Sequence, residues 1–190
     1  MARYDDSLTL RQARQRYFEN SGFDESSYED RWVKLQAGPV SFYIPNSEAR
    51  VRAVKLHDLH HPATEYDTSW TGEAEIGAWE IGSGCAHHYA AWVLNLQAWS
   101  IGLLLAPRRV FRAFVRGRSS SNLYRSTVDD ALLAESMGSL RRRLNLNQSI
   151  SKVTLADYVS FALWSGLSVA ALAMTLLPLF LLIGLIAYLI

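Results

Sequence analysis

The feature that most constrains the fold of this 190-residue chain is its last stretch, 158–190, which is apolar almost throughout and carries no charged residue. A helix needs about 20 apolar residues to cross the hydrocarbon core of a bilayer, and this stretch is longer. Soluble helices seldom run so far without a charged face, because one side of them meets water. The sequence therefore predicts a membrane-spanning helix, which Pro178 either kinks or splits into a re-entrant pair.

The apolar stretch divides the chain into two parts. We expect one domain over residues 1–152, long enough for a single hydrophobic core, and a membrane anchor over residues 153–190. Three arginines at 141–143 and Lys152 precede the anchor, and no charge follows it. The positive-inside rule then predicts a single-pass C-terminal anchor with the domain on the cytoplasmic side. The first ten residues lack the apolar core of a secretory signal.

The domain is expected to be all-α. Apolar residues recur at helical spacing in most of it, whereas the short segment 40–44 lies between two prolines and is extended at most. Strand signals are otherwise almost absent. The segments with a helical pattern are 7–20, 50–61, a helix starting near 71, 91–106 and 127–145.

A basic cluster occupies residues 108–118, where five arginines are interleaved with valine and phenylalanine. This mixture suits a helix that lies on an anionic lipid surface. A basic helix face exposed to water is the alternative. Nucleic acid is not an expected partner, because no motif of a nucleic-acid-binding fold is present.

The histidines of the chain are concentrated in one short region. Three of the five, His57, His60 and His61, fall within five positions, with Asp58 between them. Residues four apart share a helix face, so His57 and His61 point the same way and can bind one metal ion together. Asp58 lies at the edge of that face, as a third ligand or as a partner that orients an imidazole. His60 points about 100° away from His61, so we expect it at the surface or behind the ligands.

Pro62 is expected to end the first helix or to bend it sharply. A second helix is predicted after a loop over residues 62–71, with Thr71 as its N-cap. On this helix Glu73, Glu80 and His87 recur every seven residues, which is close to two turns. They would form a polar stripe on an otherwise apolar helix. Buried carboxylates are costly unless they are paired or bind a metal, so the stripe is expected to face the histidines of the first helix.

These two patterns together predict a divalent metal site between two helices of the domain. Mixed nitrogen and oxygen ligands do not distinguish Zn, Fe, Mn and Co. The predicted ligands are His57, Asp58, His61 and Glu73, and the residues placed around them are His60, Glu80 and His87.

The motif His57-Asp58-x-x-His61, followed by eleven residues and Glu73, resembles the signature of the metal-binding ubiquinone (coenzyme Q) biosynthesis family of mitochondria and many bacteria. The pair Trp79-Glu80, the apolar helix leading to Pro107 and the arginine-rich end of the helix near 140–144 are similar as well. The resemblance covers roughly residues 40–147. The C-terminal anchor and the additional histidines are departures from it.

The resemblance implies an all-α, membrane-associated protein that binds an isoprenoid lipid and holds a divalent metal on His57, Asp58, His61 and Glu73. The family is implicated in removing the ring carboxylate of a polyprenylated hydroxybenzoate, coupled to hydroxylation at that carbon, and in organising other quinone-biosynthesis enzymes. The expected activity is therefore a metal-dependent oxidative decarboxylation of a prenylated aromatic acid. The apolar helix 91–106 is either ordinary core or the surface along which the prenyl tail lies.

Two other functions stay open at this stage. The first is a non-catalytic lipid-binding scaffold for quinone-biosynthesis enzymes, in which the metal is structural. The second is a membrane di-iron oxygenase, because His57-x-x-His60-His61 forms an HxxHH box. Enzymes of that class usually carry more histidines and several spans. An HD-type phosphohydrolase is disfavoured, because no histidine precedes His57.

Overall fold

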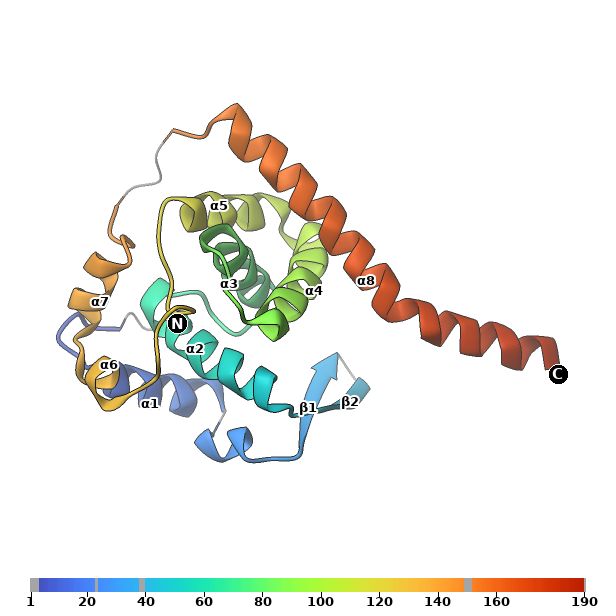
Figure 1. Cartoon of the computed structure of the whole chain (residues 1–190), viewed down its shortest axis with the longest axis horizontal. Helices are drawn as coiled ribbons and strands as arrows, with labels where there is room; N and C mark the ends of the chain where they lie inside the picture. Colours follow the sequence, from blue (N-terminus) through green and yellow to red (C-terminus); the bar gives the residue numbers. More distant parts are fainter. Residues whose placement is uncertain (1–3, 23, 38–39, 149–151, 190) are drawn as a thin grey trace.

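A computed structural model describes the chain except residues 1–3, 23, 38–39, 149–151 and 190 (Figure 1). The described residues are mostly helical, as predicted. In chain order the elements are α1 (Leu10–Ser21), the short 3-10 helix η1 (Glu25–Tyr28), β1 (Trp32–Ala37), β2 (Val40–Pro45), α2 (Glu48–Thr64), α3 (Trp70–Ser83), α4 (Tyr89–Leu105), α5 (Pro107–Arg118), α6 (Asp130–Ala134), α7 (Met137–Arg143) and α8 (Leu155–Leu189).

A β-hairpin interrupts the helical fold, so the expectation of an all-α domain is wrong in this region. β1 and β2 pair antiparallel, with Val33 opposite Ile44. The extended segment predicted at 40–44 is confirmed as β2, but its partner strand was not predicted. The signal was present, because apolar and polar residues alternate from Val33 to Ala37 with the period of a strand.

Helix α3 lies at the centre of the domain and packs against α4 and α5 (Figure 1). Two glycines allow α3 and α5 to approach closely. A Cβ atom on Gly82 would lie 2.5 Å from the carbonyl oxygen of Phe114, and one on Gly117 would lie 2.3 Å from that of Trp79. The fully buried Trp79 fills the space beside this crossing. The helix that carries Glu73 and Glu80 is therefore held firmly.

Helix α2, which carries the histidine cluster, runs through Pro62 and ends at Thr64. Pro62 therefore does not end the helix, and the loop predicted to begin there starts later in the chain. The last carbonyl groups of a helix have no partner within it, and here two arginines from other elements donate to them. Buried Arg141 donates to the carbonyls of Pro62 at 3.0 Å and Ala63 at 3.2 Å, and Arg116 donates to that of Thr64 at 3.0 Å.

Helix α3 begins and ends earlier than predicted. Its N-cap is Ser69, whose hydroxyl accepts a hydrogen bond from the backbone N–H of Gly72, and not Thr71. It ends at Ser83, where Gly84 adopts a φ of +89° that favours glycine. The predicted stripe from Glu73 to His87 is therefore cut, and His87 lies in the segment that leads to α4.

The remaining helices differ from the prediction mainly at their ends. Helix α1 starts three residues later than expected, at a capping box formed by Thr9 and Gln12. The helix predicted over 127–145 is two short helices, α6 and α7, because Glu135 is extended and Ser136 caps α7.

The basic cluster forms α5, and much of its charge is used within the domain. Arg109 binds the carboxylate of Glu75 through two hydrogen bonds of 2.9 and 2.6 Å. Arg116 lies beside the ring of Tyr66, and Arg118 pairs with Asp157 at 2.7 Å. If α5 lies on a lipid surface, the arginines that can contact the lipid are therefore chiefly the exposed Arg108 and Arg112.

Helix α8 is one continuous helix of 35 residues that contains Pro178, so the structure does not show a re-entrant pair. Its segment Leu155–Pro178 is long and apolar enough to cross a membrane, with a mean hydropathy of 1.7. Its first half lies along α4 and the edge of α5, and its C-terminal end projects away from the domain (Figure 1).

Candidate metal centre

The ligand atoms of three predicted site residues converge between α2 and α3. The Nε2 atoms of His57 and His61 are 3.1 Å apart, and the two carboxylate oxygens of Glu73 each lie 3.4 Å from one of them. In a tetrahedral site with metal–ligand bonds of about 2.0–2.1 Å, neighbouring ligand atoms are about 3.3–3.4 Å apart. These three side chains therefore already have the spacing that a small divalent ion requires.

The second nitrogen of each imidazole is held by a hydrogen bond that fixes the ring. His61 Nδ1 donates to the backbone carbonyl of Tyr66 at 3.0 Å, and His57 Nδ1 lies 2.9 Å from a carboxylate oxygen of Glu80. Both partners accept, so Nδ1 carries the proton on each ring. The Nε2 atoms that face each other are then the ones available to a metal ion, as in many metal sites in proteins.

Glu80 is the centre of a buried hydrogen-bond network behind His57. Its carboxylate is fully buried, and one oxygen accepts from Nδ1 of His57 and, at 2.6 Å, from Nδ1 of His60. The other oxygen accepts from the side-chain amide of Asn95 and from the hydroxyl of Tyr124, each at 2.6 Å. Four donors match the four acceptor sites of an ionised carboxylate. Glu80 therefore lies beside His57, on the side away from the facing Nε2 atoms.

His60 is fully buried, so its placement at the surface is excluded. Its Nδ1 is bonded to Glu80, and its Nε2 accepts the backbone N–H of Leu123 at 2.9 Å. The edge of the ring packs against Trp79, with ring centroids 5.1 Å apart. Both nitrogens of His60 are therefore occupied by contacts that tie α2 to α3 and to the segment after α5.

Asp58 is the fourth predicted ligand, and the structure gives it different partners. Among the residues that the structure describes, the converging ligand atoms belong to the two histidines and to Glu73. Asp58 accepts hydrogen bonds from the hydroxyls of Tyr28 at 2.5 Å and Tyr17 at 3.4 Å. The ring of Tyr17 stacks on His61, with centroids 5.0 Å apart. Asp58 thus holds the tyrosine that covers one face of a ligand.

His87 does not reach the cluster. It is exposed in the segment between α3 and α4 and stacks on His88, with ring centroids 4.4 Å apart. His88 in turn donates from Nε2 to the backbone carbonyl of Tyr124 at 3.1 Å. The prediction that His87 continues the stripe of Glu73 and Glu80 is wrong, because α3 ends four residues before it.

Charges of opposite sign stabilise each other inside the cluster. Burial lowers the pKa of His57, but the carboxylates of Glu80 and Glu73 outweigh it, so the pKa lies well above its usual value. Burial raises the pKa of Glu73 and Glu80, but the neighbouring imidazoles outweigh it and both pKa values are lowered. In the metal-free protein His57 is therefore protonated between two ionised carboxylates, and a metal ion must displace that proton.

Several residues of the site were not singled out in the sequence. They are Tyr17, Tyr28, Tyr66, Asn95 and Tyr124. One of them carried a usable signal: Asn95 is a polar residue within the apolar run 91–106 and is buried in the structure. A buried amide needs a partner, and the nearest buried carboxylate of the central helix supplies it.

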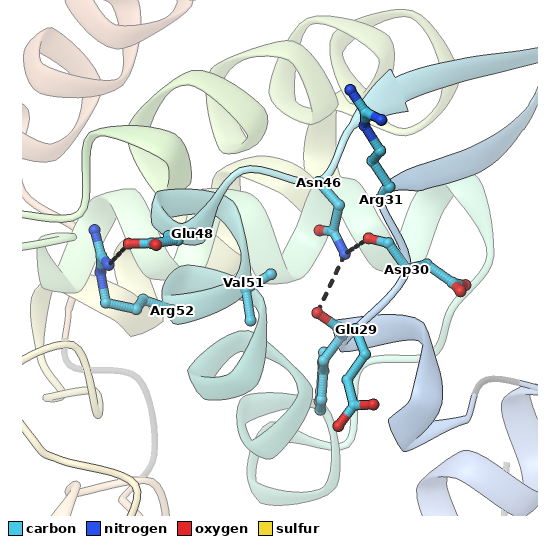
Figure 2. A pocket seen from close by; sticks show the side chains of 8 residues that line it. Glu29, Asp30, Arg31, Asn46, Glu48, Val51 and Arg52 are labelled. Carbon is cyan, nitrogen blue, oxygen red and sulfur yellow. Dashed lines mark hydrogen bonds and ion pairs between the residues drawn. The ribbon is translucent and has the colours of Figure 1, made fainter.

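A separate hollow of about 380 Å³ lies on the surface where η1 and β1 meet the start of α2 (Figure 2). Asn46 points across it and donates to the backbone carbonyl of Asp30 at 2.8 Å. The residues that line the hollow are Tyr28, Glu29, Asp30, Arg31, Asn46, Glu48, Val51 and Arg52. It contains none of the predicted site residues and touches the cluster only through Tyr28, whose hydroxyl binds Asp58.

Comparison of the chain with protein-family models, with curated proteins and with solved structures finds no match. The resemblance to the ubiquinone-biosynthesis family therefore depends on the sequence motif.

Proposed function

We propose that this chain is a membrane-associated, metal-dependent protein of isoprenoid-quinone biosynthesis that decarboxylates a polyprenylated hydroxybenzoate. The observation that carries the proposal is the spacing of His57 Nε2, His61 Nε2 and the Glu73 carboxylate, 3.1–3.4 Å from one another. These are residues of the HDxxH and Glu motif, and they come together although eleven residues separate its two parts.

Each residue of the cluster has a definite part in this proposal. A bound divalent ion supplies Lewis acidity, which stabilises negative charge on the substrate as carbon dioxide leaves. His57 and His61 present Nε2 to it, and Glu73 supplies negative charge. Glu80 and the carbonyl of Tyr66 keep the Nδ1 protons in place, so neither ring can turn. Replacing a ring carboxylate by a hydroxyl is a two-electron oxidation, so the coupled reaction consumes an oxidant such as dioxygen.

The di-iron oxygenase is disfavoured by the surroundings of His60. An HxxHH box supplies ligands from all three histidines, but both nitrogens of His60 are engaged with Glu80 and Leu123 in a fully buried position. The other alternative, a lipid-binding scaffold for other quinone-biosynthesis enzymes with a structural metal, uses the same three residues. The quinone profile described below distinguishes it from the enzyme.

The location that we propose is the membrane, with α8 as a single-pass anchor and the domain on the cytoplasmic side. The length and apolar character of Leu155–Pro178 support the anchor. The arginines at the end of α7, which precede it, support the orientation.

The quinone profile of a deletion strain tests the function. Wild-type protein and His87→Ala, a control in an exposed histidine, are expected to restore the quinone. His61→Ala and Glu73→Ala are expected to leave it absent and to accumulate the prenylated ring that still carries its carboxylate. Full rescue by His61→Ala would show that the metal chemistry is dispensable and would favour the scaffold.

A further inference from the structure

Helix α8 is attached to the domain along much of its length by polar bonds in an apolar interface. Ser100 and Ser168 are both buried, with hydroxyls 2.8 Å apart. The indole N–H of Trp99 donates to Ser165 at 3.2 Å. Small hydroxyl residues that hydrogen-bond between helices are typical of helix pairs packed in lipid.

Two further contacts extend this interface in both directions along α8. Toward the C-terminus, Gln97 of α4 donates to the hydroxyl of Thr175 at 3.0 Å. Toward the start of α8, Asp157 accepts from Arg118 at 2.7 Å, and Tyr158 stacks on Phe111. From Asp157 to Thr175 the helix therefore lies on α4 and α5. This segment makes up most of the stretch that is long and apolar enough to span a membrane.

This attachment has a geometric consequence for the domain. If α8 enters a bilayer while these contacts persist, α4 must enter with it. The composition of α4 permits this, because Tyr89–Leu105 contains no charged residue. On its outer side Val93 is 49% exposed and Leu104 is 85% exposed, and Leu163 of α8 is 71% exposed. Large exposed apolar surfaces of this kind mark contacts with a partner or a membrane.

The residues that follow α4 are suited to the edge of a membrane. Exposed Leu105 is followed within three residues by exposed Arg108, and Arg112 is exposed one turn later on α5. Cations at this position match anionic lipid headgroups next to a hydrocarbon layer.

We propose that α4 is immersed in the lipid bilayer together with α8, so that the domain is docked against the membrane and does not hang from a free anchor. Lipid is the occupant of the α4 surface because the same apolar surface continues onto α8, which extends beyond the domain (Figure 1). The inference rests on the proposed anchor role of α8. It deepens the proposed function, because Asn95 on the inner side of α4 binds Glu80 behind His57. Helix α4 thus lies between the bilayer and the cluster formed by His57, His61 and Glu73.

Spin labels on the full-length protein test this inference. The protein is reconstituted in vesicles of phosphatidylcholine and phosphatidylglycerol, with one cysteine introduced at a time and a nitroxide attached. Leu104→Cys and Val93→Cys report on α4, Leu163→Cys reports on α8, and Gln15→Cys is a control in α1, which lies on the far side of the domain from α8 (Figure 1). Native Cys85 is fully buried, and unsubstituted protein gives the background.

Collisions of each label with oxygen, which concentrates in lipid, are compared with collisions with a water-soluble nickel chelate. We expect the ratio of oxygen to nickel collisions to shift toward lipid at 104, 93 and 163 and toward water at 15. Labels at 104 and 93 that report water while 163 reports lipid would overturn the inference and leave the anchor intact. A label at 163 that reports water would refute the anchor itself. Labels on α4 shielded from both reagents would overturn the inference in favour of a protein partner.

Discussion

Replacing Glu80 by glutamine tests whether the buried network behind His57 prepares the metal ligands. The substitution keeps the shape of the side chain but removes its charge and turns one acceptor into a donor. If the amide oxygen faces the imidazoles of His57 and His60, the new NH2 group faces the amide of Asn95 and the hydroxyl of Tyr124. The Tyr124 hydroxyl can rotate and accept a hydrogen bond from the new NH2 group. The side-chain NH2 of Asn95 still faces that group, so two donors meet without an acceptor between them.

The cost follows from these contacts. Two imidazole hydrogen bonds lose the charged acceptor, at about 1 kcal/mol each, and one buried donor is left unpaired, at about 1–3 kcal/mol. Glutamine recovers part of this, because it avoids the burial of a charge. We therefore expect Glu80→Gln to lower the free energy of unfolding of the metal-free protein by about 2–4 kcal/mol. Because the Nδ1 proton of His57 is held less well, zinc affinity should fall by about 10–100-fold.

Calorimetric zinc titration and denaturant unfolding of the full-length protein in detergent measure both effects. Glu75→Gln is the matched control, because Glu75 is on the same helix but binds the exposed Arg109. It should leave zinc affinity unchanged. Zinc binding by Glu80→Gln as tight as that of the wild type would refute the argument that this network orients His57.

Four further predictions concern the same structure. Because the pKa of His57 is raised, zinc affinity should increase with pH until the pH passes that pKa, and each bound ion should release about one proton. Calorimetric titrations in two buffers of different ionisation enthalpy measure the number of protons released. The stabilisation that protonated His57 gives to the metal-free protein should likewise be complete below its unfolded pKa of about 6.5 and be lost as the pH rises through the raised value. Arg141→Met should lower the free energy of unfolding by about 3–5 kcal/mol, because it removes the buried guanidinium that donates to the carbonyls at the end of α2 and pairs with Glu65. Equal stability by denaturant unfolding would count against this role. His87→Ala should leave zinc affinity and stability unchanged, since the side chain is exposed and distant from the ligands.

Much of the site could be predicted from the sequence because helical periodicity is local. The spacing of His57 and His61 fixes their common face, and Glu73 is close enough in sequence to return to it after one loop. The prediction for His87 failed because Gly84 ends α3, although the run Gly82-Ser83-Gly84 is a turn signal that the sequence already carries. Of the two effects expected of Pro62, the helix end is not observed. Helix α2 continues to Thr64, where Arg141 and Arg116 donate to its last carbonyls from distant parts of the chain.

The part that sequence reasoning missed depends on contacts between distant segments. Tyr17 and Tyr28 meet Asp58 from α1 and η1, and Tyr124 meets Glu80 from the segment after α5. No periodicity connects these tyrosines to the histidine cluster, so only the folded chain reveals them. Helical geometry places His60 either at the surface or behind the ligands. The packing of α2 on α3 decides between these positions, because His60 is fully buried.

The metal content of the purified full-length protein shows whether His57, His61 and Glu73 bind a single ion. The protein is saturated with zinc or cobalt, freed of loosely bound ions and measured beside Glu73→Ala and the control Glu75→Ala. The account predicts one equivalent of metal in the wild type and in the control, and loss of that equivalent in Glu73→Ala. Equal, sub-stoichiometric metal in all three proteins would contradict the metal site, and two equivalents of metal in the wild type would contradict a single-ion centre.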